Sequence, residues 1–192
     1  FSSGVNISSS SPFNITLNAG TAGSGGVTMS SGSQLNLSGG NLVVNSQGNV
    51  ALGNLSAGNL SVTNVGAGNL TQVAGLNVSG STTLQMGSGD ITLSNSSNVF
   101  GGSVSASGAN VNVRNNGALA MGSVTATGDL TLRSMGSLTQ SNAFTVGGTT
   151  NLTATGGPIT LTNAANSLVG AVTASGTNVS LVDSSALQLG NV

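Results

Sequence analysis

One stretch of this chain occurs twice, and that repetition limits the fold more than any local feature. Residues 89–124 return as residues 157–192 with an offset of 68 residues throughout. Without a gap the two copies are identical at 17 of 36 positions, and most differences exchange Ser for Thr or one aliphatic side chain for another. A repeat of this length predicts a stack of similar units that share one elongated core.

The local pattern within the repeat predicts strands. A unit of three residues, apolar then polar then apolar, recurs along the chain, for example at residues 91–93, 111–113 and 130–132. Alternation with period two is typical of a strand that buries one side. Helices are not expected, because Lys and Glu are absent, Gly numbers 31, and aromatic residues make up only 2% of the chain.

A turn residue that follows glycine by one or two positions stands immediately before several of these strands. We interpret these residues as a structural column at one corner of the stack, where Gly supplies a positive φ and Asn or Asp bonds its own backbone in an Asx turn. The column comprises Asn41, Asn59, Asp90, Asn110, Asp129, Pro158 and Asn178.

These spacings predict an all-β fold, a parallel β-helix (β-solenoid) of about nine coils in one segment, residues 1–192. Three super-repeats, at approximately residues 1–59, 60–129 and 130–192, are expected to hold three coils each. The coil at residues 130–158 is longer than its neighbours and contains an additional pair of strand-like units. An antiparallel sandwich is the rival fold, but it does not require equivalent positions at a fixed period.

The side chains expected to point into the core of the solenoid are apolar and recur at equivalent positions. In the central part of the chain they are Ile91, Leu93, Val104, Ala106, Val111, Val113, Leu119, Met121, Val124, Leu130, Leu132, Leu138, Phe144, Val146 and Leu152.

Three phrases carry a resemblance to a known family. They are residues 128–132 (Gly-Asp-Leu-Thr-Leu), residues 136–150 with Gly-Ser-Leu-Thr-Gln and Phe-Thr-Val-Gly-Gly-Thr-Thr, and residues 159–172, which begin Ile-Thr-Leu-Thr-Asn and close on Gly-Ala-Val. Over nearly its whole length the chain resembles the repeat regions of filamentous-haemagglutinin-like large exoproteins, two-partner-secretion adhesins of bacteria. The resemblance implies a right-handed parallel β-helix that forms the shaft of a surface adhesin.

Composition excludes several kinds of chemistry. The chain has no His and no Cys, so Ser-His or Cys-His catalysis is not expected, and we expect neither a cofactor nor a metal site. Asp90 and Asp129 share the corner column roughly 9.6 Å apart, near the separation of an inverting glycosidase, but Asn and Pro fill the same column elsewhere. We therefore favour a turn role for both and expect no enzyme.

The charged residues are few, and they argue against some partners. A formal net charge of −1 provides no basic surface for nucleic acid, and no run of apolar residues is long enough for a membrane span. Arg114 and Arg133 are expected at exposed corners, with contact to an acidic glycan as the alternative. Several Asn-x-Ser/Thr sequons, such as the one at Asn151, could carry sugars, but the strand pattern also generates them.

Two functions remain open. The first is the structural shaft of a secreted or cell-surface bacterial adhesin, which gives reach and rigidity and displays binding regions located elsewhere. The second is a solenoid whose own face binds a host-surface glycan or ice, and thermal hysteresis would reveal the ice-binding version. The expected location is extracellular or on the bacterial surface. The expected partners are other copies or adjoining segments of the same fibre, joined through the coil ends into a longer shaft or an end-to-end filament.

Overall fold

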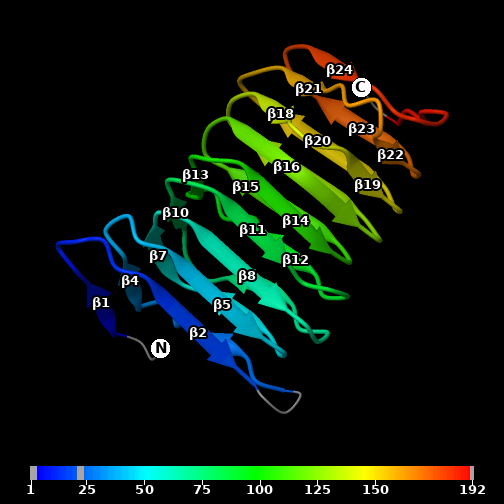
Figure 1. Ribbon diagram of the computed structural model, residues 1–192. Coiled ribbons are helices and arrows are strands. Elements are labelled where there is room, and N and C mark those ends of the chain that lie inside the picture. The colour runs from blue at the N-terminus through cyan, green and yellow to red at the C-terminus, as the bar shows by residue number, and fades with distance from the viewer. Residues whose placement is uncertain (1–3, 21–23, 191–192) are drawn as a thin grey trace.

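The chain winds into a rod of stacked coils. The structure is a computed structural model and describes residues 4–20 and 24–190. Within these residues every regular element is a strand and every strand pairing is parallel. The colour in Figure 1 runs steadily along the rod from one end to the other, and the two termini lie at opposite ends. The predicted parallel β-helix is confirmed.

The strands form three sheets. The first sheet contains β1 (Asn6–Ser8), β4 (Gln34–Asn36), β7 (Asn54–Ala57), β10 (Leu76–Val78) and β13 (Val99–Phe100). The second contains β2 (Ile15–Ala19), β5 (Leu42–Ser46), β8 (Leu60–Asn64), β11 (Thr82–Gln85), β14 (Val104–Gly108), β16 (Leu119–Ala126), β18 (Leu138–Gln140), β19 (Phe144–Val146), β21 (Ile159–Leu161), β22 (Ser167–Leu168) and β24 (Val179–Leu181). The third contains β3 (Val27–Thr28), β6 (Val50–Leu52), β9 (Leu70–Gln72), β12 (Ile91–Leu93), β15 (Val111–Asn115), β17 (Leu130–Ser134), β20 (Thr150–Ala154) and β23 (Val172–Ser175).

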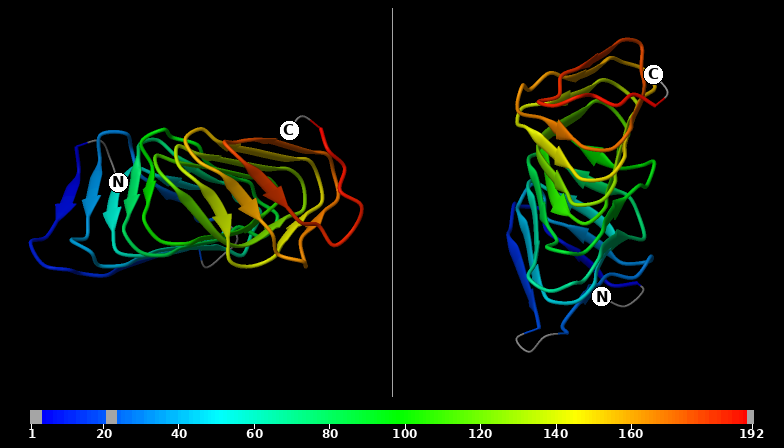
Figure 2. Two further views of the ribbon diagram at one scale, coloured as in Figure 1. Left: turned by 90° about the horizontal axis from the view of Figure 1, so that it is seen from above. Right: turned by 90° about the vertical axis from the view of Figure 1, so that its right-hand side faces the viewer.

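Each turn of the rod visits three faces in a fixed order. In the first five turns the chain passes from the first sheet to the second and then to the third. The long strand β16 then serves two faces, because its residues 119–121 pair with β18 and its residues 124–126 pair with β19. We call the ladder β16–β18–β21–β24 the continuation of the first face, since it follows the third-face strand of each preceding turn. The rod thus has eight turns, and β24 begins a ninth (Figure 2).

The repeat unit does not contain a whole number of turns. Residue equivalence pairs β12 with β21, 68 residues later, yet β12 lies on the third face and β21 on the first. In the same way β14 on the second face corresponds to β23 on the third. Counting β16 twice, the ten strand positions from β5 to β14 correspond to the ten from β15 to β23. Each repeat therefore spans three turns and one further face.

This count corrects the expectation of three coils per super-repeat. The longer segment, residues 130–158, contains four strands, β17, β18, β19 and β20, so it makes one turn and a third rather than one long coil. The extra pair of strand-like units predicted in this segment forms β18 and β19, and these two strands lie on the first and second faces of the next turn. Equivalent residues in successive repeats consequently lie on successive faces.

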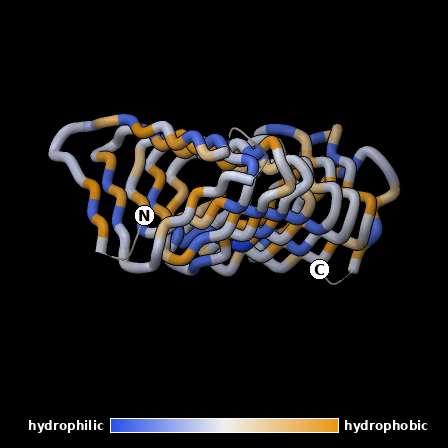
Figure 3. Tube along the Cα trace, turned by 90° about the horizontal axis from the view of Figure 1, so that it is seen from below, coloured by the Kyte–Doolittle hydropathy of each residue, from blue (hydrophilic) through white to orange (hydrophobic). Residues whose placement is uncertain are grey.

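The core is a thin apolar column inside the rod. Every side chain predicted to point inward is at most 3% exposed, so that prediction is confirmed. Along most strands, such as β5 and β17, more exposed and buried residues alternate, and Figure 3 shows the corresponding alternation of hydropathy along the trace. All three faces bury the same kind of aliphatic residue. A shift of one face per repeat therefore changes little in the interior.

Among the residues that the structure describes, two buried hydroxyl groups lack a hydrogen-bond partner. Thr82 and Thr150 are each 1% exposed, and no partner is found for either Oγ1. They are equivalent residues of the repeat, 68 positions apart, and each takes the first inward position of its strand, β11 or β20. We expect Thr82→Val and Thr150→Val each to stabilise the fold by about 1 kcal/mol, because the methyl group that replaces the hydroxyl needs no partner. Thr131→Val, on the outward side of β17, is the control. A lower melting temperature for both buried variants would contradict the assignment.

The inward and outward assignments can be tested at neighbouring residues. Val111 is 1% exposed and lies in the core, whereas Asn112 points away from it. Val111→Asp should reduce the free energy of unfolding by about 4 kcal/mol, because it places an unpaired carboxylate in a narrow apolar interior. Asn112→Asp should cost under about 1 kcal/mol. Equal melting temperatures for the two variants would refute the assignment.

Candidate functional site: polar ladders along the rod

The residues predicted to form one corner column lie in three columns. Asn41 and Asn59 precede second-face strands, β5 and β8. Asp90, Asn110 and Asp129 precede third-face strands, β12, β15 and β17. Pro158 and Asn178 precede β21 and β24, which lie on the continuation of the first face. The shift of one face per repeat is the physical reason, because these residues are equivalent in sequence and not in position around the rod.

The column before the third face is a continuous ladder of hydrogen bonds between turns. In each step a side-chain oxygen accepts from the backbone N–H of the next residue in the column, one turn further along. The steps run from Asn49 to Asn69 (2.9 Å), Asn69 to Asp90 (2.8 Å), Asp90 to Asn110 (3.0 Å), Asn110 to Asp129 (2.8 Å) and Asp129 to Thr149 (2.7 Å). The Asx turn predicted for these residues is thus corrected. Their side chains bond the next turn and not their own.

The second face begins with a similar column. The Asn14 side-chain oxygen accepts from the Asn41 backbone N–H at 2.8 Å, and the Asn59 oxygen accepts from the Ser81 N–H at 2.7 Å. Asn59 Nδ2 donates to Asn41 Oδ1 at 2.8 Å. Pro158 cannot donate such a bond, because it has no N–H. The sequence analysis missed Asn14, Asn49 and Asn69. Asn14 stands directly before the apolar-polar-apolar unit 15–17, whereas the residues after Asn49 and Asn69, Val-Ala-Leu and Leu-Thr-Gln, do not follow that pattern.

Glycine is needed at these corners for a reason other than a positive φ. Among the glycines one or two positions before the seven predicted column residues, Gly39 alone has a positive φ. A Cβ at Gly58 would lie 2.0 Å from the carbonyl oxygen of Gly39, and one at Gly89 would lie 2.0 Å from that of Gly68. Successive turns therefore approach too closely at the corner for any side chain.

A hydrogen-bonded Asn–Gln pair occurs in two equivalent copies, and in each copy the Asn is buried and the Gln half-buried. Asn98 is 0% exposed, and its Nδ2 donates to Gln72 Oε1 (2.9 Å) and to the carbonyl oxygens of Leu93 (3.1 Å) and Arg114 (3.2 Å). Its Oδ1 accepts from Gln72 Nε2 (2.7 Å) and from the Leu76 N–H (3.0 Å). Asn166 and Gln140 repeat the same arrangement 68 residues later. These amides bond three successive turns at a point where the sheet ladder is interrupted.

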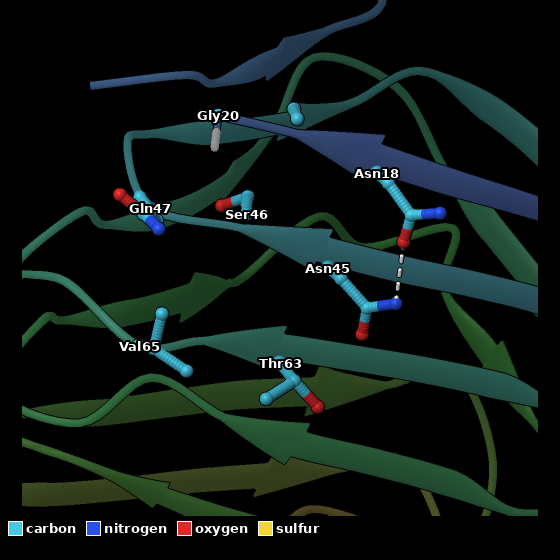
Figure 4. A pocket seen from close by; sticks show the side chains of 8 residues that line it. Asn18, Gly20, Asn45, Ser46, Gln47, Thr63 and Val65 are labelled. Atoms are coloured by element: carbon cyan, nitrogen blue, oxygen red, sulfur yellow. Dashed lines mark hydrogen bonds between the residues drawn. The ribbon is translucent and has the colours of Figure 1, made fainter. Parts of the chain in front are cut away.

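The surface carries shallow hollows at the ends of strands. One of about 320 Å³ lies over β2, β5 and β8, and Figure 4 shows the side chains of Asn18, Asn45, Thr63 and Val65 around it. Asn45 Nδ2 donates to Asn18 Oδ1 at 2.8 Å across this hollow. All of its lining side chains are uncharged. They offer amide and hydroxyl groups for hydrogen bonds, together with the apolar side chains of Ala19 and Val65.

The charged residues are distributed as follows. Asp90 and Asp129 are separated by Asn110, whose Nδ2 donates to Asp90 Oδ1 at 2.9 Å. Thr149 Oγ1 donates to Asp129 Oδ1 at 2.9 Å. Both carboxylates therefore take part in the ladder. Arg114 and Arg133 are not corner residues as predicted, because they lie within β15 and β17. Among the described residues no three His, Cys, Asp or Glu side chains gather into a metal-binding group, and no helix is long and apolar enough to cross a membrane.

The stacked strands and polar ladders define a repeat protein of the parallel β-helix class. The chain belongs to a family described as repeats of unknown function (DUF5649), which matches residues 39–107 and 108–175, more than half of its length. Each matched segment corresponds to one ten-strand unit, β5 to β14 in the first, except for the last residue of β14, and β15 to β23 in the second. The comparisons with curated proteins and with solved structures give no match.

The buried amide pair gives a prediction about stability. Asn98→Ala should lower the free energy of unfolding by about 3 kcal/mol, because it leaves the Leu76 N–H and two carbonyl oxygens without partners inside the rod. Asn166→Ala should have a similar effect, since the environment is repeated. Asn112→Ala, on the outer surface, serves as the control. Chemical denaturation measures all three, and a cost below about 1 kcal/mol for both buried variants would rule out a structural role for the pair.

Proposed function

We propose that this chain is the structural shaft of a fibrous bacterial adhesin or related exoprotein, giving reach and rigidity to binding regions located elsewhere. One observation carries the proposal: parallel ladders connect successive turns without interruption from β3 to β23 on the third face. A rod whose every turn is hydrogen-bonded to the next resists bending, because bending would break bonds along one face. The resemblance to filamentous-haemagglutinin-like repeat regions supports the same function.

The proposed location is outside the cell or on its surface. Only 3% of the residues are charged, and Lys and Glu are absent. Such a surface provides little charge repulsion against association, so it suits a tethered or fibrous protein better than a concentrated free one. Abundant Ser, Thr and Asn keep the faces polar without charge.

The proposed partners are further coils of the same kind, either adjoining segments of one fibre or other copies of this chain. Inward side chains in the first and last described turns are only partly buried. Ile15 and Leu17 are examples, whereas the residues paired with them, Leu42 and Val44, are 0% exposed. Leu187 is also partly buried, and its repeat equivalent Leu119 is 0% exposed. Another coil at either end would cover these residues and pair the open strand edges.

The shaft function can be tested on cells of the source organism. An antibody raised against residues 1–192 should label thin fibres on the outside of intact cells in electron micrographs. Labelling that appears only after the cells are broken would contradict the proposed location. Globular, non-fibrous labelled particles would contradict the shaft itself.

The end-to-end contact is tested separately on the purified chain. Sedimentation should show association that increases with concentration, and Leu181→Asn, a polar change in the last turn, should reduce it. A stable monomer at micromolar concentration would exclude stacking of separate copies through the coil ends. It would not contradict the proposal of a shaft.

A further inference from the structure

The two arginines of this chain lie side by side on one face. Arg114 in β15 and Arg133 in β17 are directly paired in register, so their backbones are about 4.8 Å apart. They are the only Lys or Arg residues among 192. Like charges directly opposite each other on a sheet destabilise it. The pairing therefore needs an explanation other than stability.

No carboxylate neutralises this pair within the described part of the chain. Asp129 precedes Arg133 by four residues, about 13 Å along an extended chain. Asp90 lies at the same border of the face as Asp129. Asp183, the third carboxylate, accepts from the Leu168 N–H and from the Ser185 hydroxyl, both at 2.9 Å. Both guanidinium groups are thus left to solvent or to a ligand.

The arginines border a small open hollow. It measures about 90 Å³, and its lining includes Arg114, Arg133, Thr153, Thr155 and Met135. Thr153 is the residue of β20 that pairs with Arg133, so two cations and a hydroxyl follow one another along the outer row of the third face. This volume suits one small anion and not a folded domain or an extended helix.

The repeat provides an internal comparison. Asn45, Thr63 and Val65 are the equivalents of Arg114, Arg133 and Met135, and they line the hollow in Figure 4, one face earlier. That copy folds with neutral side chains in the same positions. The hollow is thus a product of the repeat, whereas the paired arginines are not required by it.

We propose that Arg114 and Arg133 together bind one tetrahedral oxyanion, a sulfate or phosphate ester group of a ligand. Each guanidinium presents a planar fork of N–H donors, and two such forks can hold different edges of one tetrahedral anion. Its negative charge would relieve the repulsion between the arginines, and its three unesterified oxygens can accept from both guanidinium groups, whereas a carboxylate offers only two oxygens. The Thr153 and Thr155 hydroxyls add neutral donors at the border of the site.

Nuclear magnetic resonance offers a direct test, because the chain has two arginines and hence two Nε–H signals. Titration of the ¹⁵N-labelled chain with sodium sulfate, at constant ionic strength in sodium chloride, should shift both signals along saturable curves with one common Kd. Arg114→Gln and Arg133→Gln should each weaken binding about tenfold or more. Both residues point outward, and an unchanged melting temperature checks that each variant folds. Shifts that do not saturate, or that survive either substitution, would overturn the proposal.

Transfer of the pair to the equivalent hollow is a second, independent test. Asn45→Arg combined with Thr63→Arg, in a chain that also carries Arg114→Gln and Arg133→Gln, should restore sulfate binding on the second face. Asn45→Gln with Thr63→Gln is the matched uncharged control. A folded graft without binding would show that a stacked pair in this hollow is not sufficient.

Two multivalent probes identify the kind of larger molecule that bears the ester group. Binding to sulfated dextran and not to phosphatidic acid vesicles would assign a sulfated polysaccharide, and the opposite result would assign a phosphate-bearing lipid surface. If inorganic sulfate binds and neither probe does, the assignment to an ester group of a larger ligand is refuted.

Discussion

The whole structure depends on the close parallel stacking of one turn upon the next. Backbone groups of each strand bond to the turns on either side at about 4.8 Å, and every other feature adapts to that spacing. The corners can hold only glycine where a Cβ would approach the carbonyl oxygen of the previous turn, as at Gly89. Where the chain leaves the sheet, side-chain amides and carboxylates form the hydrogen bonds along the rod axis. The ladder from Asn49 to Thr149 and the buried Asn98 and Asn166 do this at the surface and in the interior.

The phase of the repeat follows from ten strands and three faces. Ten is one more than a multiple of three, so each repeat places equivalent residues one face further around the rod. A row of similar residues cannot persist on one face across repeats, which argues against a long flat binding surface such as an ice lattice requires. Local chemistry can instead differ between faces, as it does for Arg114 and its equivalent Asn45. The interior is indifferent to the shift, because all faces bury the same aliphatic side chains.

Much of the fold can be predicted from the sequence, and the reason is the short range of the signals involved. The apolar-polar-apolar unit identifies inward residues such as Val111 and Leu132 correctly, because alternation along a strand needs no knowledge of neighbouring turns. The number of turns per repeat depends instead on which strands share a face. Residues 130–158 contain four strands. Their sequence does not reveal that the fourth, β20, lies on the same face as the first, β17, and pairs with it. For the same reason, the residues predicted to form one corner column lie in three columns in the structure.

The polar ladders show a related limit. Asn110 is recognisable as a turn residue, but whether its oxygen accepts from its own backbone or from Asp129 one turn away depends on the spacing between turns. The buried role of Asn98 was not anticipated, although its exact recurrence as Asn166 beside Gln140 was a detectable signal. The adjacency of the two arginines could be foreseen, since both follow equivalent units in consecutive segments. Their place within strands, rather than at corners, came only from the structure.

The register that produces the shift of one face per repeat can be measured with spin labels, because the chain has no cysteine of its own. The structure pairs Thr131 with Asn151, whereas a repeat of three whole coils would pair Thr131 with Thr160. Cysteines carrying nitroxide labels at Thr131 and Asn151 should show strong dipolar broadening, as should the control pair Thr139 and Thr160. Labels at Thr131 and Thr160 should show none. Broadening for Thr131 with Thr160 and its absence for Thr131 with Asn151 would contradict the ten-strand repeat.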